Sequence, residues 1–166
     1  MYFYRFPVRE NRYPSNIMVS PCDGKVVHIQ KINSVTTHIV VSLNIFDCHV
    51  QWCPISGIVQ SVKHKEGRFH PAYMLQKSKY NERTESIIYL PQINDKIKIV
   101  QIAGQVARRI VTDVTQKEKI RRGDRYGMIK LGSRVDLFIP HDKIKLLINI
   151  GDRLLGNKTV LGIILS

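Results

Sequence analysis

The chain has 166 residues, a length that fits one domain with a substantial buried core. Hydrophobic residues make up 43% and charged residues 23%, values typical of a folded protein, which argues against a disordered chain. The formal net charge of +13 favours anionic partners, either nucleic acid or an acidic lipid surface, and charge alone does not choose between them.

Secretory and membrane-spanning segments are not predicted. No run of about 18 apolar residues occurs, and Met1–Pro7 is too short and too interrupted for a signal peptide. The three cysteines, Cys22, Cys48 and Cys53, form no CxxC pair, so we expect reduced structural thiols and no metal site. The sequence therefore predicts an intracellular protein.

Alternation of apolar and polar residues dominates the chain and predicts β-strands. The predicted strands, in chain order, are residues 25–32, 38–43, 57–62, 86–90, 96–102, 126–139, 143–150 and 159–165. Residues 71–80 predict a short helix with Pro71 at its first position, and residues 103–112 suit either a helical turn or a strand. We expect a mainly β (α+β) fold, with residues 1–166 forming a single compact domain of short antiparallel strands and one or two short helices.

The most informative candidate site is the Gly132-Ser133 pair, which lies within the predicted strand 126–139. Apolar residues surround the pair, and Arg134 and Asp136 follow it. A serine hydroxyl held against the carbonyl before it is the arrangement that a chain needs to cut itself. Such a cut would make Ser133 a new N-terminus, open to conversion into a pyruvoyl group.

Other polar side chains stand beside apolar segments. Asp23 lies in an Asp-Gly turn, and His49 follows Asp47 by two residues. Together with Ser133 they form a carboxylate, imidazole and hydroxyl set of the kind used in nucleophilic chemistry. Each also has a simpler explanation, as a turn residue, a structural histidine or a strand serine, and the spacing alone assigns no reaction.

The order of several segments resembles the phosphatidylserine decarboxylase family, in particular its short proenzymes. The resemblance spans nearly the whole chain, from residue 3 to residue 162. The matching segments are Tyr4–Arg9, Ser20–Val26, Phe46–Val50, Pro54–Gly57, Gly67–Phe69, Asn81–Arg83, Gln101–Gly104, Ala107–Val111, Tyr126–Asp136, Gly151–Gly156 and Thr159–Leu161.

The resemblance implies autocatalytic cleavage between Gly132 and Ser133, giving a β chain of residues 1–132 and an α chain of residues 133–166. The Ser133 hydroxyl would attack the Gly132 carbonyl to form an ester. Elimination and hydrolysis would then release ammonia and leave a covalent pyruvoyl cofactor derived from Ser133. By the same resemblance, Asp23 and a histidine would assist this cleavage.

The resemblance also implies the reaction of the mature enzyme, decarboxylation of phosphatidylserine to phosphatidylethanolamine. The pyruvoyl group would accept the electrons released with carbon dioxide, and His49 would return a proton to the α carbon. Arg108 and Arg109 would contact the substrate phosphate or carboxylate, although one of them could equally sit in a structural ion pair. The partners would be phosphatidylserine and the chain's own α and β fragments, and a homodimer is left open.

The sequence departs from the family pattern in two respects. Longer members of the family have a second histidine where this chain has Trp52, and the short members also tend to lack that histidine. It therefore stays open whether His49 serves both the cleavage and the decarboxylation. No hydrophobic stretch precedes the first matching segment, so we expect peripheral docking on an anionic membrane. The aromatic residues Tyr2, Phe3, Tyr4 and Phe6 could lie at that interface or pack on the sheet.

Two other functions remain as alternatives. Trp52 and the short front end are compatible with an inactive family member that acts as a lipid-binding or interaction protein. The net charge alone would suit a basic β protein that binds nucleic acid, but the sequence has neither a basic-aromatic RNA-binding motif nor a zinc pattern. Nucleic acid is therefore the least favoured partner.

Overall fold

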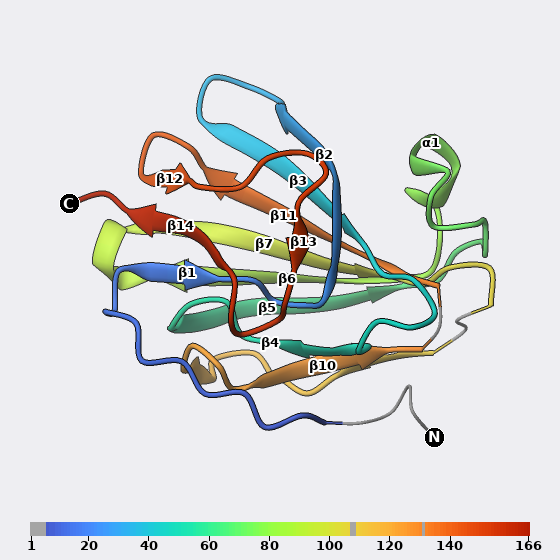
Figure 1. The fold of residues 1–166 in the computed structure, drawn as a ribbon, viewed down its shortest axis with the longest axis horizontal. Helices are drawn as coiled ribbons and strands as arrows, with labels where there is room; N and C mark the ends of the chain where they lie inside the picture. The colour runs from blue at the N-terminus through green and yellow to red at the C-terminus, as the bar shows by residue number, and fades with distance from the viewer. Residues whose placement is uncertain (1–5, 107–108, 131) are drawn as a thin grey trace.

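The computed structural model describes residues 6–106, 109–130 and 132–166. In these residues the chain forms short strands, one α-helix and one 3-10 helix (Figure 1). The strands are β1 (Ile17–Val19), β2 (Gly24–Lys31), β3 (Thr36–Ser42), β4 (Val50–Trp52), β5 (Gly57–Lys65), β6 (Arg83–Leu90), β7 (Asp95–Ile102), β8 (Ile110–Thr112), β9 (Lys119–Ile120), β10 (Arg125–Ile129), β11 (Arg134–Pro140), β12 (Ile144–Leu146), β13 (Arg153–Leu154) and β14 (Val160–Ile164). The helices are α1 (Leu75–Ser78) and the 3-10 helix η2 (Pro91–Ile93). The predicted mainly β fold is confirmed.

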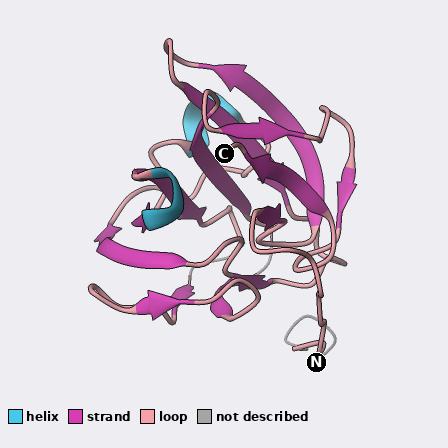
Figure 2. Ribbon diagram, turned by 90° about the vertical axis from the view of Figure 1, so that its left-hand side faces the viewer, coloured by secondary structure: helices cyan, strands magenta, loops and turns pink. Residues whose placement is uncertain are grey.

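The largest sheet has eight strands in the order β13-β2-β3-β11-β7-β6-β5-β9, with every neighbouring pair antiparallel. Two three-stranded sheets, β1-β14-β12 and β4-β10-β8, accompany it. The side view shows strands curving around a common interior (Figure 2). Alternation along β6, in which every second residue is buried, is the pattern expected where one face of a strand covers a core.

One hydrophobic cluster fills the space between the large sheet and the β1-β14-β12 sheet. It includes Ile39, Ile97 and Leu137 from the large sheet and Met18 and Leu161 from the small one. Each such fully buried side chain contributes about 2 kcal/mol of hydrophobic stabilisation. The core thus fixes the two sheets against each other.

The prediction of one continuous strand over residues 126–139 is wrong. β10 belongs to the β4-β10-β8 sheet and β11 to the eight-stranded sheet, so the chain changes sheets between Ile129 and Arg134. Gly132 has a φ of +66°, in the left-handed region that does not continue a strand. The Gly132-Ser133 pair therefore lies in a connection between two sheets and not inside a strand.

The helix predicted over residues 71–80 is shorter than expected. α1 covers Leu75–Ser78, and Pro71 lies in the turn before it, where its carbonyl accepts a hydrogen bond from the Met74 amide at 3.0 Å. Residues 103–112 were expected to form either a helical turn or a strand. Ile110–Thr112 form the strand β8, residues 103–106 are not helical, and residues 107–108 lie outside the described part of the chain.

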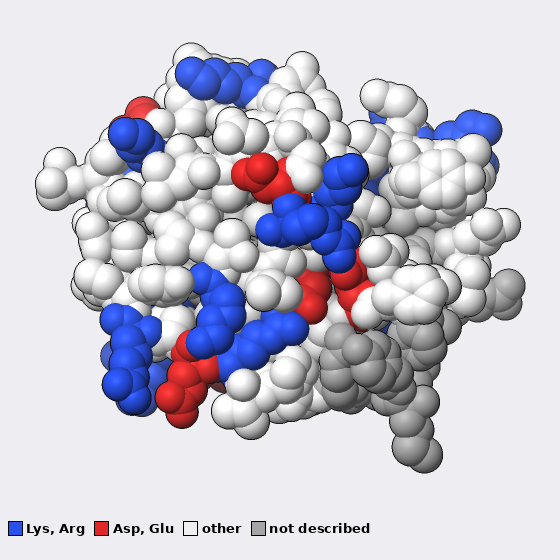
Figure 3. Space-filling view, in the orientation of Figure 1, with Lys and Arg blue, Asp and Glu red and all other residues white. Residues whose placement is uncertain are grey.

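Basic side chains are scattered over the face seen in Figure 3, with acidic side chains among them, and do not gather into one continuous patch. None of the helices in the described part of the chain has the length and apolar character needed to cross a lipid bilayer. All three cysteines are buried.

Candidate functional site

The connection that carries Gly132-Ser133 runs beside the connection between β3 and β4. The two are tied at both ends by backbone hydrogen bonds, from the Leu43 amide to the Ser133 carbonyl at 2.9 Å and from the Ile129 amide to the His49 carbonyl at 3.2 Å. These bonds bring the segments of Ser133 and His49 to the same end of the molecule, on the right of Figure 1.

A backbone contact fixes the carbonyl of the Gly132-Ser133 bond. Gly104, which follows β7, lies so close to Gly132 that a Cβ atom built on Gly104 would be 1.5 Å from the Gly132 carbonyl oxygen. A side chain at position 104 would collide with that oxygen, so only glycine permits the approach. The requirement at Gly104 was not recognised in the sequence, although the residue ends one of the family segments.

Ser133 is fully buried, and its hydroxyl has no hydrogen-bond partner among the residues that the structure describes. A buried hydroxyl without a partner costs about 1–3 kcal/mol. The Ser86 hydroxyl is likewise buried and unpartnered among the described residues, so the position of Ser133 directly after the Gly132 carbonyl is what marks it as the candidate nucleophile. The hydroxyl directly follows the carbonyl that Gly104 holds in place. These residues fit the formation of a pyruvoyl group at position 133.

A pocket of about 360 Å³ opens beside Gly132. Its lining comes from the β3–β4 connection, from the segment before α1 and from the segment after β7. The side chains that line it are mostly apolar and include Leu43, Ile45, Ala72, Tyr73 and Val106. The pocket offers room for a small ligand next to the candidate cleavage site.

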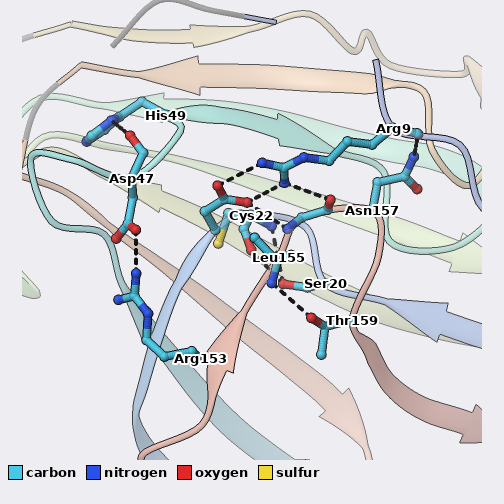
Figure 4. Close-up of polar contacts among 11 residues, drawn as sticks. Arg9, Ser20, Cys22, Asp47, His49, Arg153, Leu155, Asn157 and Thr159 are labelled. Carbon is cyan, nitrogen blue, oxygen red and sulfur yellow. Dashed lines mark hydrogen bonds and ion pairs between the residues drawn. The ribbon is translucent and has the colours of Figure 1, made fainter. Parts of the chain in front are cut away.

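His49 is buried, and a hydrogen bond fixes the orientation of its ring. The Nδ1 atom lies 2.7 Å from the Asp47 carbonyl oxygen, as Figure 4 shows, so we assign the proton to Nδ1. This tautomer leaves the Nε2 lone pair as the basic position of the ring. A fixed imidazole of this kind can accept or donate a proton at a defined place.

A buried amide network supports the backbone of His49. The Gln51 side chain donates to the His49 carbonyl at 3.0 Å, and Gln101 donates to the Gln51 side-chain oxygen at 2.6 Å. Thr112 in turn donates to Gln101 at 2.7 Å. Sequence reasoning missed Gln51, although a polar residue between the apolar Val50 and Trp52 was a visible signal.

Asp23 is held by several donors. Its carboxylate pairs with the Arg9 guanidinium and accepts hydrogen bonds from the Gly156 amide at 2.8 Å and from the Cys48 amide. Burial by itself would raise the pKa of Asp23, but the bonds from Arg9 and the two amides outweigh burial and lower the pKa. Asp23 therefore sits next to the His49 segment as a stable anion.

The Asp23 region is closed by contacts from distant segments. In Figure 4, Arg9 and Asn157 lie close together, and Arg153 reaches Asp47 from β13. The Arg153–Asp47 distance is 2.7 Å. The N-terminal and C-terminal parts of the chain thus hold the segment that leads into His49.

Of the two arginines predicted to contact the substrate, the structure describes only Arg109. Arg109 is exposed, and its carbonyl accepts a hydrogen bond from the Lys130 amide at 3.3 Å, which puts it beside the connection that carries Gly132-Ser133. Arg108 lies outside the described residues.

Trp52, which the sequence resemblance placed where longer family members have a second histidine, is a packed residue in the structure. Its ring is buried, stacks on Phe6 at a centroid distance of 6.2 Å, and lies 4.9 Å from the Arg9 guanidinium carbon. The N-terminal aromatic residues were expected either to lie at a membrane interface or to pack on the protein. Phe6 packs on the protein, through its contact with Trp52, and Tyr2, Phe3 and Tyr4 lie outside the described residues.

Comparison with known proteins gives matches over nearly the whole chain. A sequence model of the family described as phosphatidylserine decarboxylase matches residues 1–162. A phosphatidylserine decarboxylase proenzyme of Desulfotalea psychrophila is 36% identical over 168 residues, covering 98% of this chain and 78% of the relative. The proenzymes of that name from Saccharopolyspora erythraea and Anaplasma phagocytophilum are 37% and 36% identical, covering 96% of this chain and 71% and 72% of the relatives. The resemblance predicted from the sequence segments is confirmed.

The Asp23→Asn substitution should lower the free energy of unfolding by about 3 kcal/mol near pH 7, because it leaves the Arg9 guanidinium without its carboxylate partner. The pKa of Asp23 in the folded state lies below the ordinary 3.8. The ionised carboxylate therefore stabilises the fold fully above its unfolded-state pKa, and this contribution is lost as the pH falls through the folded-state pKa. Urea unfolding in a Ser133→Ala background, which keeps the chain whole, should show the difference shrinking below about pH 4.

Asp95→Asn is the matched control, since Asp95 forms an ion pair with Lys143 at the surface. It should cost less than about 1 kcal/mol. Equal losses for the two variants at pH 7 would contradict the anchoring role of Asp23.

The Gly104→Ala substitution should slow the predicted cleavage between Gly132 and Ser133 by about 100-fold or more, because the new methyl group would displace the carbonyl that Ser133 is expected to attack. Cleavage is followed on denaturing gels after rapid purification. Gly57→Ala is the control, since its Cβ would lie 2.6 Å from the Tyr89 carbonyl in β6, away from the site. Normal cleavage in Gly104→Ala, or equal slowing in both variants, would show that the contact does not position the bond.

Proposed function

This chain belongs to the phosphatidylserine decarboxylase family, and from that premise we propose that it cuts itself between Gly132 and Ser133 and then decarboxylates phosphatidylserine to phosphatidylethanolamine. The observation that carries the proposal is the buried Ser133 hydroxyl without a partner among the described residues. It lies directly after a carbonyl that Gly104 holds. The relatives are named proenzymes, which agrees with a chain that must be processed.

Cleavage begins when the Ser133 Oγ attacks the Gly132 carbonyl carbon and the amide becomes an ester. Elimination across the Cα–Cβ bond of residue 133 frees the Gly132 carboxylate and leaves a dehydroalanine at the new chain start. Hydrolysis of that residue releases ammonia and yields the pyruvoyl group. Its carbonyl supplies, once formed, an electron sink for the pair released with carbon dioxide.

The two products are expected to stay together as one fold. The α chain of residues 133–166 would carry β11, which pairs with β3 on one side and β7 on the other, both from the β chain of residues 1–132. β14 of the α chain pairs with β1 of the β chain. Breaking one bond in a connection leaves these ladders intact, so the site survives its own processing.

His49 is the residue that we assign to proton transfer. The Asp47 carbonyl holds the Nδ1 proton, so Nε2 is the position that would accept the Ser133 hydroxyl proton during cleavage. The same ring would later donate a proton to the α carbon of the product. Because Trp52 is a packed structural residue, we propose that His49 serves both steps.

Asp23 acts as a positioning residue in this proposal. Its carboxylate is already bonded to Arg9 and to two backbone amides, one of them that of Cys48, the residue before His49. It therefore supports the His49 segment and does not need to remove a proton itself. Arg109, exposed beside the site, is suited to contact the phosphate or carboxylate of the substrate, and Arg108, the residue before it in the sequence, would share this role.

The substrate would reach the site from a membrane, so we propose peripheral association with an anionic lipid surface, in keeping with the net charge of +13. An inactive lipid-binding family member is the second candidate, and Trp52 is the residue that favours it. The buried Ser133 hydroxyl, placed directly after the carbonyl that Gly104 approaches, supports the active enzyme over that candidate. A homodimer stays a prediction.

Denaturing gels and intact mass should give two fragments, residues 1–132 and 133–166, the smaller one without a free amine. The Ser133→Ala variant should remain a single chain, because it lacks the attacking oxygen. Ser86→Ala is the matched control, since Ser86 is an equally buried serine in β6, and it should cut normally. A wild-type chain that is folded and stays uncut would contradict the proposal.

The His49→Gln substitution should slow cleavage and the decarboxylation per cleaved chain by about 100-fold or more each, because a proton-transfer group is lost. The two rates are read separately, by gel and by carbon dioxide release from phosphatidylserine. His64→Gln is the control, because His64 lies partly exposed in β5 beside Glu82, and both rates should hold. Slowing of one rate alone would assign His49 to that step only.

A further inference from the structure

We propose that the end of the molecule around Gly132 is a docking surface for an anionic lipid bilayer. The inference rests on the proposed function, because it gives the substrate its route to the site. The surface presents exposed apolar side chains from the connections around the pocket beside Gly132, here called the apolar rim. The rim consists of Ile45, Phe46, Tyr73, Met74, Tyr80 and Val106.

Exposure and clustering distinguish the rim from ordinary surface residues. Phe46 is 71% exposed, Tyr73 73% and Val106 68%. Single exposed apolar side chains are common on soluble proteins, but a group of them around one pocket marks an interaction surface. Ile45, Tyr73 and Val106 also line the pocket, Phe46 and Met74 are their neighbours in the chain, and Tyr80 closely follows α1.

Hydrogen bonds hold the Ile45–Phe46 tip outward. The Asn44 side-chain oxygen accepts the amides of Phe46 at 2.8 Å and Asp47 at 3.1 Å, and the Asp47 carboxylate accepts the Asn44 amide at 2.8 Å. Arg153 then pins Asp47 to β13 at 2.7 Å. The apolar residues of this tip are exposed because the turn points them away from the core.

The Tyr73–Met74 tip is anchored to the strand that follows the cleavage site. The Ser78 hydroxyl donates to the Ala72 carbonyl at 3.2 Å, and the buried Arg134 donates to the Ser78 hydroxyl at 2.8 Å. Arg134 is the residue directly after Ser133 and pairs with Asp136 at 3.0 Å. A preordered tip of this kind loses little entropy when it meets a surface.

The charge around the rim matches an anionic membrane. Residues 43–46, 71–80 and 105–106 contain no Asp or Glu, and their only charged residues are Lys77 and Lys79, both exposed. Arg109 adds a third exposed cation. In Figure 3 the end that carries α1 is largely uncharged, with basic side chains at its upper edge. Apolar side chains bordered by cations are typical of proteins that lie on anionic lipid.

The geometry favours a bilayer over a protein partner because of where the pocket opens. A phospholipid substrate must bring its head group to position 133 while its acyl chains stay in an apolar medium. A pocket whose mouth lies inside the apolar rim allows this without extraction of the whole lipid from the membrane. The rim would therefore sit at the level of the lipid head groups during turnover.

Co-sedimentation with vesicles tests the surface. The probe is a mixture of phosphatidylcholine and phosphatidylglycerol, which contains no substrate and so reports binding alone. The variant F46S/M74S/Y80S removes three rim residues that do not line the pocket, and its vesicle partitioning should fall by about tenfold or more. The control V8S/I150S/L155S removes equally apolar exposed residues from other segments, and its partitioning should match the wild type.

Activity on two substrates separates this inference from the proposed function. The rim variant should cut itself and decarboxylate a water-soluble, short-chain phosphatidylserine at wild-type rates, but lose about tenfold activity on phosphatidylserine in vesicles. Unchanged vesicle binding by a variant that cuts normally would overturn the docking surface and leave the proposed function standing. A wild-type chain that never cuts would overturn the proposed function, while its vesicle binding would still test the rim.

Sedimentation velocity tests whether the apolar rim instead binds a second copy of this chain. If the wild type were a dimer, and the rim variant a monomer that still bound vesicles normally, the rim would be a subunit interface and the bilayer assignment would be wrong.

Discussion

The contact between Gly104 and the Gly132 carbonyl is the constraint on which the site depends. It occurs where the chain leaves the β4-β10-β8 sheet and enters the eight-stranded sheet, so residue 132 belongs to neither ladder. The left-handed φ of Gly132 and the absence of a side chain at Gly104 together fix the carbonyl of the bond that enters the buried Ser133. A continuous strand would have used the same backbone groups for pairing, and the proposed cleavage would then have needed a ladder to open first.

Around that bond, anchoring and chemistry fall to different residues. The Asp23 carboxylate accepts hydrogen bonds from Arg9 and from two backbone amides, and these bonds hold the segment that leads to His49. The His49 ring, oriented by the Asp47 carbonyl, is the group assigned to proton transfer in the proposed reaction. Trp52, packed against Phe6 and Arg9, adds rigidity to the chain just after His49. Rigid support of this kind is what the proposed cleavage of a buried bond would require.

Much of the fold was predictable because most strands bury one face, and β6 shows the resulting alternation along its whole length. The prediction failed between β10 and β11, where both flanking strands are buried almost throughout, so an unbroken apolar pattern concealed a change of sheet. The helix predicted over residues 71–80 was too long. The Arg134 side chain donates hydrogen bonds to the Leu75 carbonyl and the Ser78 hydroxyl, and the sequence of the segment gives no sign of this distant contact. Periodicity reports burial, and it does not report which sheet a strand joins.

The sequence by itself determined the mainly β class, the family, and the residue types at the site, because alternation and the ordered segments are local properties of the chain. Only the tertiary structure decided which groups meet. Asp23 bonds to an amide 133 positions away, and Gly104 packs against a carbonyl from another sheet connection. Such contacts arise when the sheets close on a common core, and no local spacing encodes them.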